Sequence, residues 1–183
     1  MNSVGKEEKN KGSFGKETKS WILSIVSAVV VALLIRTFIV ELYVVDGPSM
    51  QPTLQDGERL VVNKFIYHWR DPLKGEVVIF RYPRDHSRDF IKRVIAVGGD
   101  TIEIKDGHVY VNDALVNEDY IAEKTRTEYP KATVPEGTLF VCGDNRRNSL
   151  DSRFPDVGFV PLELVKGKAA LIFWPIDNIA SLP

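Results

Sequence analysis

Residues that common catalytic and structural sites require are scarce in this sequence of 183 residues. It has one cysteine, Cys142, so an intrachain disulfide is excluded, and a lone thiol cannot form a structural zinc site. The three histidines, His68, His86 and His108, do not stand in surroundings typical of a catalytic base. The formal net charge is −1, whereas nucleic-acid-binding domains usually carry a basic excess. The composition therefore argues against a disulfide scaffold and against a nucleic-acid-binding protein.

Long apolar runs are absent from the sequence, with one exception. Residues 21–40, WILSIVSAVVVALLIRTFIV, contain a single charged residue, Arg36, near the end of the run. A helix of about twenty apolar residues matches the thickness of a bilayer core, and a long arginine side chain near a helix end can reach the lipid headgroups. We therefore predict a transmembrane helix over residues 21–40.

Two other interpretations of this run are open. A cleaved secretory signal has a shorter apolar core followed by small residues, but the bulky residues TFIVELYVV end and follow this run. A buried helix of a soluble domain shows a polar stripe, which is nearly absent here. An uncleaved signal anchor fits the pattern best.

The residues before this run are polar. Residues 1–20 contain five lysines and three glutamates and have no periodic apolar face, which predicts a disordered, mildly basic tail. Lysines in front of an anchor favour a cytoplasmic N-terminus. We therefore expect a single-pass type II protein of the cell membrane, with residues 41–183 forming an extracytoplasmic domain.

Beyond about residue 45 the pattern changes to short β-like runs separated by turns. The runs RLVVNKF, GEVVIFRY, FIKRVIAV, TLFVCGD and GKAALIFW are rich in apolar and β-branched residues. In TIEIKDGHVYVND, two alternating segments flank Asp106 and Gly107, the preferred pair for a tight hairpin turn. A short helical turn is expected near Glu163. The sequence predicts a mainly β domain, an antiparallel sheet or barrel, preceded by one transmembrane α-helix.

Two further segments give structural predictions. Cys142 has apolar neighbours and is expected to be a small buried core residue. Residues 117–137, NEDYIAEKTRTEYPKATVPEG, are polar and weakly patterned, so we expect an extended, mobile excursion that is not part of the core.

Candidate chemistry begins at Ser49 in VDGPSMQPTL. A serine becomes a nucleophile when a neighbouring base removes its proton, and a lysine can replace the usual histidine. Such a lysine must be neutral, and burial is the physical way to lower its pKa. In DFIKRVIAV, Lys92 and Arg93 point to opposite faces of a strand. This pattern does not say which of them faces the interior, or whether both are surface charges.

Three segments resemble the boxes of the type I signal peptidases. GPSMQPTL is similar to their serine box, FIKRVIAVGGD to their lysine box, and GDNRRNSLDSR, residues 143–153, to their third box, GDNR-x-x-S-x-DSR. The boxes follow the order of the family, and the resemblance extends from the expected anchor to about residue 173. It implies a protease with a serine–lysine dyad that removes signal peptides from exported proteins. It also implies a β fold shared with LexA-like proteins, the single N-terminal anchor of the Gram-positive form, and no metal or organic cofactor.

The resemblance assigns a role to each matched residue. Ser49 would be the nucleophile, and Lys92 would take its proton and return it to the leaving amine. The backbone N–H of Ser49 would stabilise the oxyanion. Some members carry a hydroxyl donor at the position of Gly47, so the second donor here is open between a main-chain group and water. Ser149 aligns with a serine that holds the lysine amine, and four charged residues would brace the site: Asp144, Arg146, Asp151 and Arg153.

The same resemblance implies the partners. Substrates would be secretory preproteins with small residues at positions −1 and −3, and the chain would contact a phospholipid membrane and no nucleic acid. Residues 41–47, ELYVVDG, would supply part of a strand edge that binds the substrate. Trp69 and Trp174 are either membrane-interface or core aromatics.

Two rival functions remain. Self-cleaving repressors of the LexA type share the dyad and a similar fold, but they carry a DNA-binding domain where this chain has the apolar run. A non-catalytic, membrane-anchored β module, or an inactive relative, would keep the fold without the chemistry.

Overall fold

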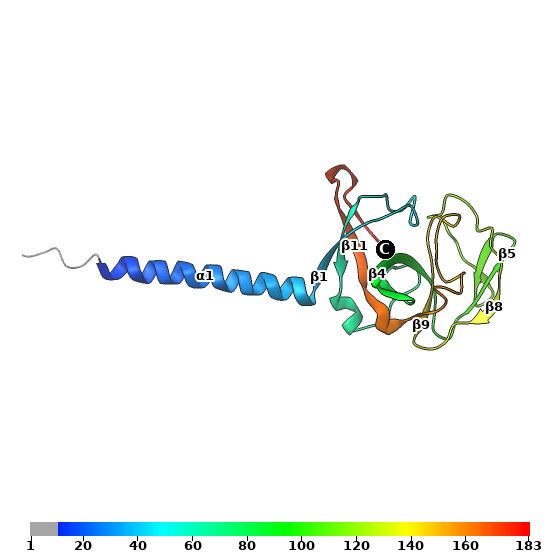
Figure 1. The fold of residues 1–183 in the computed structure, drawn as a ribbon, viewed down its shortest axis with the longest axis horizontal. Coiled ribbons are helices and arrows are strands. Elements are labelled where there is room, and N and C mark those ends of the chain that lie inside the picture. Colours follow the sequence, from blue (N-terminus) through cyan, green and yellow to red (C-terminus); the bar gives the residue numbers. More distant parts are fainter. Residues whose placement is uncertain (1–10) are drawn as a thin grey trace, which may run out of the picture. The chain divides into compact units, whose positions relative to one another are not determined.

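The computed structural model describes residues 11–183, without the side chains of residues 11–17 and 34–37. Residues 1–10 of the predicted tail and the side chain of Arg36 therefore lie outside the described residues. The prediction of a disordered tail is wrong for residues 11–20, because they belong to a helix that continues into the apolar run. The chain divides into two units, the first ending at Ile39 and the second spanning Val40–Pro183, and each is described by itself (Figure 1).

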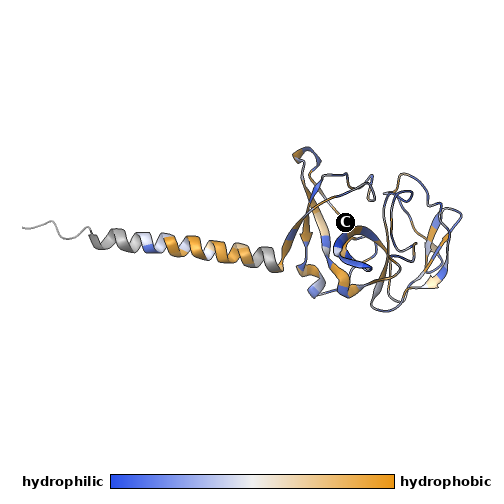
Figure 2. Cartoon of the chain, in the orientation of Figure 1, coloured by the Kyte–Doolittle hydropathy of each residue, from blue (hydrophilic) through white to orange (hydrophobic). Residues whose placement is uncertain are grey.

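The first unit contains one unbroken helix, α1, Lys11–Phe38. Its middle part is apolar (Figure 2), and the described apolar side chains along it are exposed, including Trp21, Leu23 and Val31. Among the described residues, no helix is both long and apolar enough to span a bilayer, so the predicted transmembrane helix is not confirmed. The predicted helix end at residue 40 is two residues too late, because Val40 already pairs with Asn63 in a sheet.

The second unit is mainly β, and its strands pair antiparallel, as predicted. The larger sheet has the order β1-β2-β11-β3-β4-β9-β10, with β12 paired to β11. Its strands are β1 Val40–Val44, β2 Arg59–Asn63, β3 Val77–Tyr82, β4 Asp85–Val97, β9 Thr138–Cys142, β10 Val160–Pro161, β11 Val165–Trp174 and β12 Ala180–Ser181. The smaller sheet has the order β7-β6-β5-β8, with β5 Thr101–Lys105, β6 His108–Val111, β7 Ala114–Leu115 and β8 Tyr129–Thr133.

Short 3₁₀ turns connect some of these strands: η1 Phe65–His68, η2 Leu162–Leu164 and η3 Ile176–Asn178. The turn expected near Glu163 is η2. Asp106 and Gly107 form the predicted hairpin between β5 and β6, and both have positive φ, 52° and 79°. An aspartate and a glycine tolerate this conformation better than other residues do, which is why the pair marks the turn in the sequence.

The core of the second unit consists of three clusters of buried apolar side chains. Cys142 is fully buried in one of them, as predicted. Met50 and Leu54 are fully buried in another, so the segment that follows Ser49 is anchored in the core. The position of Ser49 is therefore fixed by apolar packing immediately after it in the chain.

The prediction for residues 117–137 was wrong in one respect, because this segment does contribute to the core. It contains β8, which pairs with β5, and Val134 is fully buried. Thr125 is only 2% exposed. The polar sequence YPKAT of β8 gives no strand signal, because β8 is an edge strand whose pairing depends on a partner distant in sequence.

Candidate active site

Ser49 lies in the loop between β1 and β2, which main-chain hydrogen bonds hold at both ends. The amide of Val45 donates to the carbonyl of Glu58 over 2.8 Å, and the amide of Gly57 donates to the carbonyl of Val45 over 2.9 Å. Gly47 has a φ of +87°, a conformation that L side chains rarely adopt. Its amide donates to Asp56 Oδ1 over 2.7 Å. The turn before Ser49 is thus built on a glycine and closed by a carboxylate.

Lys92 lies in β4, and its amine is next to Ser49. The Nζ of Lys92 is 2.9 Å from Ser49 Oγ and 2.8 Å from the carbonyl oxygen of Ile91. Lys92 and Arg93 are each 3% exposed. The predicted alternation places them on opposite faces of β4, and both faces are covered. The alternative of two surface charges is therefore wrong.

Burial changes the acidity of the Lys92 amine. Loss of water around the charged form lowers the pKa of Lys92 from 10.5 to about 8, although the carboxylates of Asp151 and Asp144 oppose this shift. A substantial fraction of this amine is consequently neutral at mildly alkaline pH. A neutral amine within hydrogen-bonding distance of a hydroxyl is able to accept its proton.

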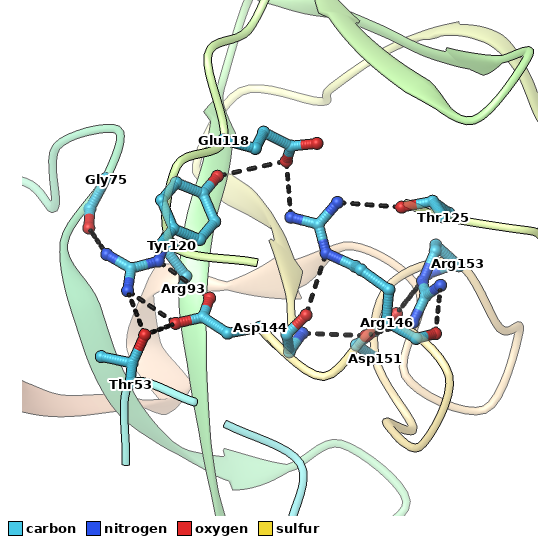
Figure 3. Close-up of polar contacts among 11 residues, drawn as sticks. Thr53, Gly75, Arg93, Glu118, Tyr120, Thr125, Asp144, Arg146, Asp151 and Arg153 are labelled. Atoms are coloured by element: carbon cyan, nitrogen blue, oxygen red, sulfur yellow. Dashed lines mark hydrogen bonds and ion pairs between the residues drawn. The ribbon is translucent and has the colours of Figure 1, made fainter. Parts of the chain in front are cut away.

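Asp144 connects the third box to both other boxes (Figure 3). Arg93 donates to it from Nε over 2.9 Å and from Nη2 over 2.6 Å, a bidentate contact between side chains that are almost fully buried. The hydroxyl of Thr53, four residues after Ser49, donates to Asp144 Oδ2 over 2.5 Å. One carboxylate therefore joins the strand of Lys92 to the loop of Ser49.

Asp151 organises the rest of the third box. It accepts hydrogen bonds from the Gly143 amide over 2.9 Å and from the Ser149 hydroxyl over 2.7 Å. Arg153 donates to it from Nε and Nη2 over 2.8 and 2.9 Å. Ser149 was expected to hold the Lys92 amine, whereas its hydroxyl points to Asp151 here. The assignment of Ser149 to Lys92 therefore stays a prediction.

Gly143 allows three parts of the site to come close together. A Cβ added at this position would lie 2.5 Å from Ser149 Cβ and would also overlap Ser149 Oγ and the carbonyl oxygen of Ser49. The main chain of Ser49 and the side chain of Ser149 are thus packed directly against a glycine backbone.

Replacing Gly143 with alanine is expected to lower kcat/KM of a reaction that uses Ser49 about 100-fold, because the new methyl group must push Ser49 and Ser149 away from it. The melting temperature should fall as well. Steady-state kinetics and thermal unfolding by circular dichroism measure both effects. Gly137→Ala is the control for activity: no atom lies within 4 Å of a Cβ there, and although its φ of +73° strains an alanine and should lower the melting temperature as well, kcat/KM should stay unchanged. Full activity of Gly143→Ala would contradict the packing described.

A cavity of about 370 Å³ lies beside Ser49 and Lys92. Its walls come mainly from β1 with the loop after it and from the first half of β4. The lining residues are Tyr43, Val44, Val45, Asp46, Ser49, Leu60, Ile79, Arg88, Asp89, Phe90, Ile91, Lys92 and Leu150. In the described part of the chain, no group of three or more histidine, cysteine or acidic side chains is placed to hold a metal ion.

The structure brings the predicted residues Ser49, Lys92, Asp144, Ser149 and Asp151 into one connected site. Other residues of this network were not predicted as site residues. Arg93 and Thr53 are inside the lysine and serine boxes, so the motifs contained a signal for them. Glu118 bonds to Arg146, and the ring of Tyr120 contacts Arg93. Both lie in the segment that was predicted to be an excursion, and their sequence contains no such signal.

Comparisons with known proteins show to which family this chain is similar. Residues 18–174 match the family model described as signal peptidase, peptidase S26. A probable signal peptidase I-2 of Synechocystis sp. is 41% identical over 87% of this chain and 74% of its own length. The signal peptidase I of Bacillus amyloliquefaciens is 36% identical over 95% of this chain and 97% of its own. A crystal structure of a signal peptidase I from Enterococcus faecalis superposes with a TM-score of 0.50 at 32% identity, covering 55% of this chain and 98% of that one.

Proposed function

Because this chain belongs to the signal peptidase family, peptidase S26, and is a type I signal peptidase, a serine protease, we propose that Ser49 and Lys92 form its catalytic dyad. Its substrates are secretory preproteins, from which it removes the N-terminal signal peptide. The observation that carries this proposal is the distance of 2.9 Å between a buried lysine amine and the Ser49 hydroxyl.

The dyad performs two proton transfers in each half of the reaction. Neutral Lys92 takes the proton of Ser49 as Oγ attacks the carbonyl carbon at position −1 of the preprotein. The lysine then gives this proton to the leaving amine, the peptide bond breaks, and the signal peptide is held as an ester of Ser49. Lys92 next takes a proton from water, which attacks the ester, and returns it to Ser49 Oγ as the signal peptide leaves.

Charge that develops on the substrate oxygen needs hydrogen-bond donors. The Ser49 amide is proposed as the first donor. The amide of Gly47 already donates to Asp56, so we propose that Gly47 supports the site through its backbone conformation, and that a main-chain group or water is the second donor. Asp144, Arg146, Asp151, Arg153 and Ser149 are proposed to hold the Ser49 and Lys92 segments in place.

The edges of the larger sheet suggest how a preprotein binds. β1 is an edge strand, and β4 pairs with β9 only from Arg93 onward, so Asp89 to Lys92 pair on one side with β3. The cavity lies between these two segments. An extended peptide can add main-chain hydrogen bonds there. Its residues −1 and −3 would face the cavity together, because alternate side chains share a face.

We propose that the enzyme acts at a membrane, with a cytoplasmic tail at the N-terminus, the apolar part of α1 from residue 21 to residue 38 as a single-pass type II anchor, and the second unit, Val40–Pro183, as the extracytoplasmic catalytic domain. The exposed apolar side chains of α1 support an apolar environment for that helix. Trp69 and Trp174 are 77% and 48% exposed, so they are not core aromatics, and this exposure is compatible with an interfacial position.

The test is cleavage of a preprotein with an Ala-x-Ala site by the full chain in detergent, with the new N-terminus identified by mass spectrometry. We expect cleavage after the second alanine. A phenylalanine at position −1 should slow cleavage at least about 100-fold, because the proposed specificity requires a small side chain next to Ser49. A phenylalanine at position −2 is the matched control, since that side chain faces away from the cavity. Equal rates for all three substrates would contradict the proposed mode of binding.

A further inference from the structure

Residues 117–125, which we call the strap, cover the third box and link it to β4. The strap precedes β8 and is held by polar contacts that Figure 3 shows. Three of its side chains take part: Glu118, Tyr120 and Thr125. Their partners are two buried arginines, Arg93 and Arg146, which lie on either side of Asp144.

Glu118 neutralises Arg146. The carboxylate of Glu118 accepts a hydrogen bond from Arg146 Nη2 over 2.6 Å, and the side chains are 8% and 0% exposed. Thr125 Oγ1 accepts from Nη1 over 3.0 Å, and the carbonyl of Gly143 accepts from Nε over 3.0 Å. A guanidinium buried in this way depends on its counterion, because an uncompensated buried charge is strongly unfavourable.

Tyr120 contacts the other arginine. Its ring centroid is 4.1 Å from Cζ of Arg93, within the range of a cation–π contact. Its hydroxyl donates to Glu118 over 3.1 Å. Arg93 follows Lys92 directly in β4 and bonds to Asp144 with two of its nitrogens. The strap thus contacts both Arg93 and Arg146, the two arginines on either side of Asp144.

The turn that the strap holds is bonded to the nucleophile. Arg146 Nε fixes the carbonyl of Gly143, and the intervening Asn145 donates from its amide to the carbonyl of Ser49 over 3.1 Å. Asn145 Nδ2 donates to the carbonyl of Pro48 over 3.1 Å. A displacement of Arg146 would therefore move the main chain of Pro48 and Ser49 through a continuous set of hydrogen bonds.

We propose that Glu118 and Tyr120 are positioning residues of this protease, which hold the Gly143–Arg146 turn and Arg93 so that Ser49 and Lys92 stay aligned. This inference rests on the proposed dyad. Neither residue touches the reacting atoms. Their effect on the reaction passes through the two guanidinium groups.

The first test is Glu118→Gln, which keeps the shape of the side chain and removes its charge. Measured well below the melting temperature of the variant, kcat for a preprotein should fall about 10- to 100-fold with little change in KM, because the dyad is misaligned while the binding cavity is kept. The apparent pKa of the kcat/KM profile should rise, since a loosened turn admits water to the Lys92 amine. Tyr120→Phe removes one hydrogen bond and should lower kcat by a few-fold.

Glu123→Gln is the matched control on the same strap, because the Glu123–Arg147 pair is about half exposed on both sides. It should leave kcat, KM and the pH profile unchanged. If Glu118→Gln and Tyr120→Phe lower the melting temperature but the folded proteins keep the parent kcat and pH profile, the strap is only structural and the inference is wrong. If Glu118→Gln does not fold, the kcat and pH profile of Tyr120→Phe decide.

If the proposed dyad were wrong, the experiments would give a different result. In that case Ser49→Ala or Lys92→Met would retain cleavage, whatever the strap variants do. Loss of activity in both dyad variants, together with parent-like kcat in Glu118→Gln, would overturn the strap inference alone.

Discussion

Ser49→Ala is expected to reduce cleavage of a preprotein by at least about 10⁴-fold, to the level of the substrate alone. The substitution removes the attacking oxygen and little else. The main-chain carbonyl of residue 49 still accepts from the Asn145 amide, and Lys92 still bonds to the carbonyl of Ile91. The melting temperature should therefore change little. The measurement is the amount of mature product over time, with thermal unfolding followed in parallel.

The variant also separates binding from chemistry. Because the proposed main-chain contacts to β1 and β4 do not need the hydroxyl, Ser49→Ala should still bind the preprotein with an affinity close to that of the parent, measured by fluorescence anisotropy. Ser181→Ala, at an exposed position of β12, is the control and should cleave normally. Substantial turnover by Ser49→Ala would place the nucleophile elsewhere.

Much of the fold follows from local pattern. The hairpin around Asp106 and Gly107 was predicted because its turn residues and its alternation agree with each other. The strand β8 was missed because YPKAT has little apolar character and is held by β5, whose paired residues lie 25 to 32 positions earlier in the chain. The residues of β1 were predicted to supply part of a strand edge only through the family resemblance, since the apolar run of α1 continues into Val40, the first residue of β1.

The site residues also differ in how far the sequence could predict them. Ser49 and Lys92 could be named because each lies in a motif with a definite spacing. The burial of Arg93 could not be predicted, because it depends on Asp144, 51 residues away, and on Tyr120 of the strap. Glu118 has no local signal at all, since a single glutamate in a polar segment is usually solvated. Its role depends on Arg146, 28 residues further along.

Lys92→Met is expected to abolish cleavage and yet to stabilise the fold. Methionine has a similar length and no base, so kcat should fall at least about 10⁴-fold. The pKa of Lys92 is lowered from 10.5 to about 8 by burial, which corresponds to a cost of about 3 kcal/mol for keeping this amine charged in the folded protein. An apolar side chain in the same place avoids that cost. Kinetics and urea unfolding measure the two effects.

The gain in stability expected for Lys92→Met depends on pH. Between pH 8 and 10.5 the native state has already released the proton that the unfolded state still binds, so the free energy of unfolding of the parent rises with pH across this window. Lys92→Met lacks this rise, so its advantage in stability should be largest below pH 8 and should shrink toward pH 10.5. The parent's kcat/KM should increase through the same apparent pKa of about 8, because the base must be neutral.

Lys92→Arg distinguishes a base from a fixed positive charge. A guanidinium keeps the charge but cannot be deprotonated in this range, so this variant should be as inactive as Lys92→Met if it folds. Lys131→Met, at an exposed lysine paired with Asp113, is the control and should change neither the rate of cleavage nor the pH dependence of stability. Activity in Lys92→Arg would mean that position 92 supplies electrostatic stabilisation, and that another group takes the proton of Ser49.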